Sequence, residues 1–268
     1  MYINESLARL EALPQTVVAH RRDLGKDETV PRHRHRRAQL VYASSGVMTV
    51  TTDDGAFVVP PQRAVWMPGG VAHRIDAPSP VAMRTLYVEP SAVPDFPKAV
   101  CVLQVSALLR ELILAAIAAR PDYPPGGPED RIMSVILDQI RILPVAPLSL
   151  PIPADPRLRQ IVETLIADPS DARGLEQWAR SAGASARTLA RLFSAQTDMS
   201  FRAWRQQRRL LRALEMLAAG NKVTAVAIEL GYESTSAFSA MFRRCLGTTP
   251  TRYFDAAGPV RNPEEAFD

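Results

Sequence analysis

The sequence predicts an α+β protein with three parts: a small N-terminal β-barrel, a helical segment, and a C-terminal all-α domain that carries a tandem helix-turn-helix. Three observations support this class. The N-terminal part contains short runs that alternate apolar and polar residues between Gly and Pro, which is typical of strands. Two apolar helical patterns and a Pro-rich stretch follow. The C-terminal part then repeats one helix-turn-helix pattern.

Changes in pattern divide the chain into four predicted segments. Residues 1–98 form the barrel, 99–154 the helical segment with its linker, and 155–256 the helix-turn-helix domain. The remaining residues, 257–268, are predicted to be a disordered tail. Because 47% of the 268 residues are hydrophobic, each main domain has enough apolar side chains for its own core.

Strands of the barrel are predicted at 39–42, 46–52 and 56–59. The Asp-Gly turn at 53–55 lies between two alternating runs, which is a strong signal for a hairpin. Several short strands separated by Gly and Pro favour a small barrel or a sandwich.

Three of the 4 histidines fall in one arrangement. His33 and His35 are two residues apart, so on a strand they face the same side, and Gln39 keeps the same parity. His73 ends a Pro-Gly-Gly-Val-Ala-His segment. His20 has no comparable neighbours and is predicted to be a surface residue.

The middle of the chain predicts helices at 103–119 and 129–143, joined by a Pro- and Gly-rich loop. Arg110 and Glu111 interrupt the wide apolar face of the first helix, so no membrane span is predicted. We expect this face either to form a homodimer interface or to pack against the barrel of the same chain. The prolines between 144 and 156 predict a stiff linker.

Two helix-turn-helix motifs are predicted at about 174–195 and 223–246. Each combines a short amphipathic helix, a glycine that can adopt positive φ, and a serine that caps the second helix, Ser185 or Ser234. A helix at 201–219 joins the motifs. At about 1.5 Å per residue it is nearly 30 Å long, close to the ~34 Å of one DNA turn, so both second helices can enter successive major grooves.

Charge and cysteine content agree with a DNA-binding protein. Residues 155–254 hold 15 Arg and Lys against 9 Asp and Glu, whereas the first 154 residues hold 16 against 15. The sequence pI near 9.3 suits a protein that displaces counterions from phosphates. Cys101 and Cys245 have no framework spacing, and no signal peptide pattern begins the chain, so we expect reduced thiols and a cytoplasmic protein.

The second motif and the residues after it resemble the signature of AraC/XylS-type transcription regulators. The resemblance covers about 155–254 and rests on Gly231, Tyr232, Glu233, Ser234, Phe238, Phe242, Arg243, Arg244, Gly247, Thr248, Thr249, Pro250 and Tyr253. It implies a DNA-binding domain of seven helices that binds double-stranded promoter DNA, with RNA polymerase as a further partner.

The resemblance also implies which residues contact DNA, on or next to the two recognition helices. These are Ser185, Ala186, Arg187, Thr188 and Arg191 in the first motif, and Ser234, Thr235, Ser236, Ser239, Arg243 and Arg244 in the second. Arg187 and Arg191 are the predicted base readers, because a guanidinium can donate two hydrogen bonds to guanine. Many family members have arginine at the position of Ala240, so the second motif is expected to contribute mostly phosphate contacts through Arg243 and Arg244.

Residues 30–75 resemble the two cupin motifs, with His33 and His35 in the first, followed by Gln39 and a glycine, and His73 at the end of the second. In metal-binding cupins these positions form a three-histidine site with a glutamate, which Gln39 replaces here. The resemblance implies either a divalent transition metal site without an anionic ligand or a metal-free effector pocket. Histidines that only pack and form hydrogen bonds are the third alternative.

We therefore predict a sequence-specific transcription regulator, activator or repressor, that responds to a small-molecule or metal effector through the cupin-like barrel. The similar subgroup often sits beside efflux genes, which implies an efflux gene as a target and a small toxic organic molecule as a signal. One alternative is a cupin metal-dependent enzyme fused to a DNA-binding domain. Gln39 argues against it, because redox-active cupin iron sites generally need an anionic donor, and we predict no enzyme activity. The other alternative is a purely structural barrel that dimerises the protein.

Overall fold

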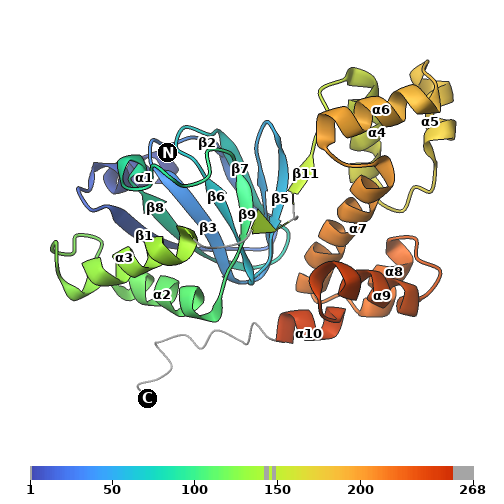
Figure 1. Ribbon diagram of the computed structural model, residues 1–268. Helices are drawn as coiled ribbons and strands as arrows, with labels where there is room; N and C mark the ends of the chain where they lie inside the picture. Colours follow the sequence, from blue (N-terminus) through green and yellow to red (C-terminus); the bar gives the residue numbers. More distant parts are fainter. Residues whose placement is uncertain (1, 142–144, 147–148, 256–268) are drawn as a thin grey trace. The chain divides into compact units, whose positions relative to one another are not determined.

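A computed structural model describes residues 2–141, 145–146 and 149–255 of the chain (Figure 1). The described residues separate into two compact units. One contains the chain up to residue 53 and the described part of 57–147, and the other contains 54–56 and the described part of 148–256. The first unit is coloured blue to green in Figure 1 and the second mostly yellow to red.

Two antiparallel sheets form the framework of the N-terminal unit. The strand order in the larger sheet is β1 (Val17–Leu24), β8 (Val81–Val88), β3 (Ala38–Ser45), β6 (Arg63–Met67), β9 (Cys101–Gln104) and β10 (Val145–Ala146). The order in the part of the smaller sheet that belongs to this unit is β5 (Gly55–Val59), β4 (Met48–Thr51), β7 (His73–Ala77) and β2 (Glu28–His33). The predicted hairpin is confirmed, because β4 and β5 are neighbours on either side of the Asp-Gly turn.

The register of these strands determines which side chains meet. Gln39 on β3 lies opposite Tyr87 on β8 and Met67 on β6. His33, the last residue of β2, lies opposite His73, the first residue of β7, after a shift in the β2 ladder. The strands therefore bring together residues that are about 40 positions apart in sequence, which is what a long-range antiparallel pairing does.

Helices α2 (Ala107–Ala118) and α3 (Pro128–Arg141) pack on the larger sheet. The Ser106 hydroxyl accepts a hydrogen bond from Leu109 N and thus caps α2. The apolar residues that the two helices bury in one cluster with the sheet are Leu109, Ile113, Ala116, Met133, Ile136 and Ile140. Of the two alternatives for this apolar face, packing against the barrel of the same chain is the one observed.

Two expectations for the N-terminal half are wrong in detail. Residues 2–12 form a helix, α1 (Tyr2–Ala12), where only strands were expected. The helix expected from 103 begins at Ala107, because 101–104 pair with β6 as strand β9 and Ser106 caps the helix that follows. The expected linker also contains the short strands β10 and β11 (Ser149–Pro151), since proline is tolerated at the ends of strands. The expected tail at 257–268 lies outside the described residues.

The described part of the C-terminal unit contains seven helices besides β11. They are α4 (Pro156–Ala167), α5 (Leu175–Ala182), α6 (Ala186–Thr197), α7 (Phe201–Ala218), α8 (Val223–Glu229), α9 (Thr235–Leu246) and α10 (Pro250–Asp255). The expected joining helix is confirmed as α7, which lies between the α5–α6 pair and the α8–α9 pair (Figure 1). It buries Trp204, Leu210, Leu211 and Leu214. Trp204 donates its indole N–H to Pro151 O at 2.8 Å.

A short 3₁₀ helix at Pro90–Ala92 completes the described elements. Within the described residues, no helix is both long enough and apolar enough to cross a membrane.

Candidate DNA-binding surface and sensor cavity

The first helix-turn-helix motif is α5, a tight turn, and α6. Gly183 ends α5 with φ of 61°, in the left-handed region that favours glycine. The Ser185 hydroxyl then accepts from Thr188 N at 3.1 Å and caps α6, as expected. Arg187 and Arg191 are exposed and lie one turn apart on α6, so both guanidinium groups are accessible to a ligand on this side of the helix.

The second motif, α8 and α9, repeats this turn. Gly231 has φ of 72°, and the Ser234 hydroxyl accepts from Ala237 N at 3.1 Å. Among the expected contact residues on α9, Ser236, Arg243 and Arg244 are exposed, whereas Thr235 and Ser239 are half-buried. With Ala240 between them, the exposed positions in the middle of α9 have no long donor side chain, in contrast to α6.

Aromatic and leucine side chains hold both motifs in place. Leu189, Phe193, Phe238 and Phe242 are fully buried, whereas Leu192 is only half-buried. The Phe193 ring lies 5.9 Å from the Trp204 ring of α7, and the Phe242 ring lies 5.6 Å from that of Tyr253 on α10. These side chains position the recognition helices and are not available to DNA.

Three arginines of α7 bind backbone carbonyls at the end of α4 and in the segment that joins α4 to α5. Arg208 donates to Ile166 O at 2.7 Å, and Arg209 Nε donates to Pro169 O at 2.9 Å. Arg205 donates to Arg173 O at 3.0 Å and also to Asp171 O. Burial lowers the pKa of Arg208 and of Arg205, although both remain cations at neutral pH. The sequence did not separate these structural arginines from exposed ones, because all lie on the same helix.

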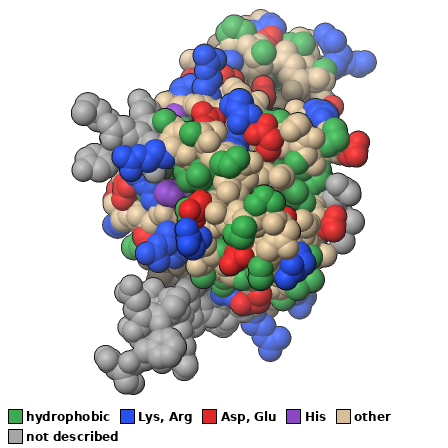
Figure 2. Space-filling model, turned by 90° about the vertical axis from the view of Figure 1, so that its left-hand side faces the viewer, with side chains coloured by type: hydrophobic (Ala, Val, Ile, Leu, Met, Phe, Trp, Pro, Cys, Tyr) green, Lys and Arg blue, Asp and Glu red, His purple; other side chains and the backbone are tan. Residues whose placement is uncertain are grey.

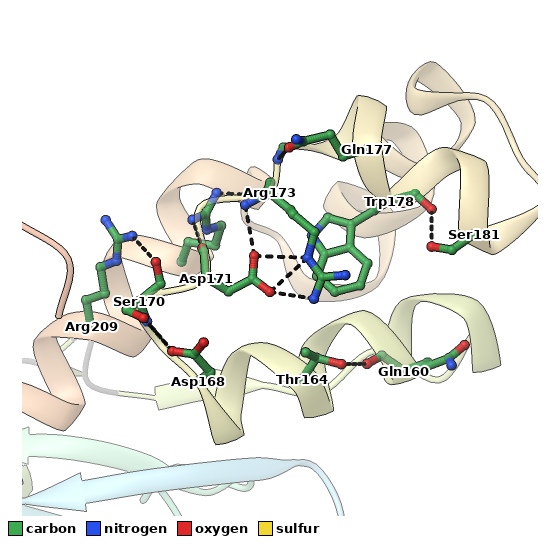
Figure 3. Close-up of polar contacts among 12 residues, drawn as sticks. Gln160, Thr164, Asp168, Ser170, Asp171, Arg173, Gln177, Trp178, Ser181 and Arg209 are labelled. Carbon is green, nitrogen blue, oxygen red and sulfur yellow. Dashed lines mark hydrogen bonds and ion pairs between the residues drawn. The ribbon is translucent and has the colours of Figure 1, made fainter. Parts of the chain in front are cut away.

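The 168–173 segment is also ordered by its own side chains (Figure 3). Asp168 accepts from Ser170 N at 3.0 Å, and Asp171 pairs with the Arg173 guanidinium, which lowers the pKa of this carboxyl. Arg173 in turn lies over the Trp178 ring of α5, 3.6 Å from its centroid. The segment thereby connects the first motif to α7 through a chain of charged contacts.

A basic cavity of about 580 Å³ lies inside the C-terminal unit, between α7 and α9. Four arginines line it: Arg202, Arg205, Arg209 and Arg244. Phosphates of a DNA backbone are the ligands that such a surface attracts. Arg202 and Arg209 were not among the expected contact residues.

In the N-terminal unit, the three expected histidines are brought together. The ligand nitrogens of His33, His35 and His73 lie within 4.8 Å of one another, and the rings of His33 and His73 are 4.2 Å apart. The expected reason is wrong, however: His35 lies after the end of β2, in the turn to β3, so strand parity does not place it. His73 and His35 are buried and His33 is half-buried.

Each of these rings has its Nδ1 within hydrogen-bond distance of a backbone carbonyl. The acceptors are Pro31 O at 2.8 Å, Arg37 O at 2.7 Å and Val71 O at 3.0 Å, for His33, His35 and His73 respectively. A proton held on Nδ1 leaves Nε2 with its lone pair, the form that binds a metal ion. Burial lowers the pKa of His73 to about 3 and that of His33 below its usual value, so both rings are neutral.

Two further contacts make the cluster fit a divalent transition metal. His73 Nε2 is buried and has no hydrogen-bond partner among the described residues. His35 Nε2 lies 2.9 Å from Gln39 Oε1, so two acceptors face each other if Nδ1 carries the only proton of the ring. A cation bound by these two acceptor atoms resolves this conflict. Such a metal would be held by His33, His35, His73 and Gln39, and it would supply a Lewis-acidic position for a ligand.

A cavity of about 290 Å³ adjoins this cluster. Its lining includes His33 and Gln39, and His20 as well. His20 stays outside the histidine cluster, as predicted, but it is half-buried and not fully at the surface. His20 faces the cavity because β1 pairs with β8, and this long-range pairing leaves no local sequence signal. Figure 2 shows histidine side chains on one face of the molecule, next to arginine or lysine side chains.

Comparisons with known proteins agree with this geometry. Residues 16–126 match the family model of the AraC-like ligand binding domain, and 178–256 match that of a helix-turn-helix domain. The chain is 42% identical to the HTH-type transcriptional regulator NimR of Escherichia coli over 231 residues, 85% of this chain and 84% of that protein. It is 37% identical to the regulator RipA of Corynebacterium glutamicum over 103 residues, 38% of this chain and 31% of that protein.

Among solved structures, ToxT from Vibrio cholerae matches 91% of this chain and 99% of its own chain, with 11% identity and a TM-score of 0.40. The DNA-binding domain of AdpA in complex with a target DNA matches 38% of this chain and 93% of its own, with 30% identity and a TM-score of 0.36.

The two motifs and the ligand-binding barrel define a DNA-binding transcription regulator with an N-terminal ligand-binding domain. The chain belongs to the AraC/XylS family of these regulators, and its relatives are transcriptional regulators.

Proposed function

We propose that this regulator senses its signal through a divalent transition metal held by His33, His35, Gln39 and His73. The observation that carries this proposal is the unpartnered, buried Nε2 of His73, which points to a ligand because buried polar atoms are rarely left without a partner. The hydrogen bonds from Nδ1 of the rings to carbonyls support it, since they orient the donors before any metal binds.

For DNA, we propose that Arg187 and Arg191 of α6 read bases in one major groove. Both are exposed and neither has a partner among the described residues, so binding a base breaks no existing ion pair. Ser185, Ala186 and Thr188 lie at the N-terminus of the same helix, where backbone N–H groups favour phosphate. The contacts from α9 are assigned as mainly phosphate contacts, made by the residues Ser234, Thr235, Ser236, Ser239, Arg243 and Arg244.

We further propose how the regulator acts in the cell. The regulator acts on a promoter together with RNA polymerase, in the cytoplasm, and a neighbouring efflux gene is its target. It forms a homodimer, for which exposed Leu108 on α2 and Val135 on α3 offer apolar contacts. It is not an enzyme: the neutral Gln39 at the cluster does not supply the anionic donor that redox chemistry at such a metal needs.

Metal analysis of the purified native protein tests the sensor, with His73→Ala and His20→Ala as a matched pair. His20 lines the cavity but lies outside the histidine cluster. We expect near-stoichiometric metal in the native protein and in His20→Ala, and little in His73→Ala. A native protein that stays metal-free after dialysis against Zn²⁺ and Co²⁺, yet binds its upstream DNA, contradicts the metal and leaves an organic effector pocket.

Gel-shift titrations with and without the metal then decide whether the barrel senses or only stabilises. A sensor must bias one arrangement of the protein by a few kcal/mol, which changes DNA affinity by roughly tenfold or more. Equal DNA affinity of the metal-loaded and metal-free proteins, with no response to any added effector, favours a purely structural dimerising barrel.

A further inference from the structure

The donors around the histidine cluster carry no negative charge when a metal is bound. The three imidazoles are neutral in the form that binds metal, and the fourth group is an amide. A divalent cation held only by neutral donors in a buried site keeps its full charge, which is costly unless an anion accompanies it. This inference rests on the proposed metal site.

The orientation of the Gln39 amide is determined by its neighbours. Thr85 Oγ1 donates to Leu40 O at 3.0 Å, and it therefore accepts from Gln39 Nε2, 2.8 Å away. This leaves Gln39 Oε1 directed at the cluster, 2.9 Å from His35 Nε2. The amide thus offers its oxygen to a cation. If it turned its NH₂ group there, Thr85 would have to donate to Gln39 Oε1 and would lose its bond to Leu40 O.

The adjoining cavity has the chemistry of a site for a small organic anion. Arg21 and Arg22 lie in its wall together with His20, and no Asp or Glu is among the described residues that line it. Arg22 pairs with Glu28 at 2.9 Å, whereas Arg21 has no ion-pair partner among the described residues. The rest of the wall is mostly apolar: Leu7, Leu10, Val30, Ile75 and Met83.

We propose that the effector is a small organic carboxylate, whose charged group faces His33 and Gln39 and whose apolar body lies against Leu10 and Met83. The carboxylate supplies the negative charge that Gln39 lacks, so metal and effector bind cooperatively, each raising the affinity for the other. A cavity of about 290 Å³ limits the effector to a small molecule.

Cobalt(II) titrations of the full-length protein test this, because the visible absorption of Co²⁺ reports its ligands without any DNA readout. Benzoate is the anionic probe and benzamide its neutral counterpart of the same shape. In the native protein we expect Co²⁺ to bind at least about tenfold more tightly with benzoate than with benzamide, and the spectrum to shift only with benzoate. Equal Co²⁺ affinity with both probes overturns the proposal but leaves the metal site in place.

Gln39→Glu sharpens the test, because it adds a carboxylate at the position of the amide. We expect this variant to bind Co²⁺ tightly without benzoate and to lose most of the benzoate dependence. Gln39→Met keeps a side chain of similar length without a charge, and we expect weaker Co²⁺ binding that still depends on benzoate. If native protein and Gln39→Glu both fail to bind Co²⁺ under any condition while remaining folded by circular dichroism, the metal site itself is refuted and this inference with it.

Discussion

The two helix-turn-helix motifs share their turn chemistry but differ in what they present and in how they are attached. Each has a left-handed glycine and a serine cap at corresponding positions, Gly183 with Ser185 and Gly231 with Ser234. The first motif exposes two arginines in the first half of its recognition helix, whereas the second exposes small side chains there. The glycine and the serine cap therefore form the turn of the motif, and a few exposed side chains determine which DNA bases it contacts.

Attachment to α7 also differs between the motifs. Arginine side chains of α7 hold the segment leading into the first motif through backbone carbonyls. The second motif follows α7 after a short turn, and Arg212 of α7 reaches Glu229 of α8 only at 3.7 Å, with the Glu229 side chain exposed. We therefore expect the first motif to depend on buried charged contacts and the second mainly on its apolar core.

The largest expected effect separates base reading from phosphate binding. Arg187→Ala with Arg191→Ala should reduce affinity for the natural operator by about 2–6 kcal/mol, since each bidentate contact to guanine is worth about 1–3 kcal/mol, and leave binding to unrelated DNA much less affected. Arg243→Ala with Arg244→Ala is the matched variant in the second motif. It should weaken binding to both DNAs and lower the slope of log K against log salt by about 0.9 per lost phosphate contact.

Fluorescence anisotropy at several salt concentrations measures both pairs. An unchanged affinity of the α6 double variant for the operator would contradict the assignment of α6 as the base-reading helix. Equal loss of specificity in both double variants would mean that the two motifs read DNA alike, which contradicts the comparison.

The second prediction concerns the attachment of the first motif. Arg208→Met removes the donor to Ile166 O while keeping a long apolar side chain, so we expect a loss of about 1–3 kcal/mol in the free energy of unfolding. Arg202→Met, at an exposed position of the same helix, is the control and should stay within about 0.5 kcal/mol. Urea denaturation followed by circular dichroism compares them, and equal stability of the two variants argues against a structural role for Arg208.

The sequence predicts a feature well when the interacting residues are only a few positions apart in the chain, and poorly when they are distant. The turns were predictable, because a glycine with positive φ and a capping serine act within a few residues, as Ser185 and Ser234 illustrate. Which arginines of α7 are exposed and which bind the backbone was not predictable. Arg202 and Arg208 lie in similar local sequence, and only Arg208 meets a carbonyl, Ile166 O, from a remote part of the chain.

The sensor cavity illustrates the same limit. His33, Gln39 and His73 were predicted from motif spacing, and the structure brings their side chains together. His35 was predicted for the wrong reason, because its place in a turn depends on where β2 ends. His20 was missed, since only the pairing of β1 with β8 turns it toward the cavity.

The third prediction compares the two turn glycines. Gly183→Ala and Gly231→Ala both force alanine into the left-handed region, at a cost of about 1–2 kcal/mol. A Cβ at Gly183 meets no atom within 4 Å, whereas at Gly231 it lies 3.3 Å from Ser170 O. Because Ser170 belongs to the segment bound by Arg209, it cannot move freely, and Gly231→Ala should be the more destabilising. Thermal melting of both variants measures the difference. A lower melting temperature for Gly183→Ala than for Gly231→Ala would show that the segment around Ser170 moves easily.

The smallest expected effect is at the helix caps. Ser185→Ala and Ser234→Ala each remove one acceptor from an exposed helix N-terminus, so each should cost about 1 kcal/mol of stability. The corresponding changes to glycine should cost only a few tenths, because glycine leaves the N-terminal amides open to water. Ser185 also bonds the Thr188 hydroxyl at 2.9 Å, but this bond is exposed, and water replaces it in the variant. The two serines should therefore be equivalent in chemical denaturation to within about 0.5 kcal/mol. A much larger loss at one of them would show that its turn depends on more than the cap, and that the two motifs differ in their backbone as well as in their exposed side chains.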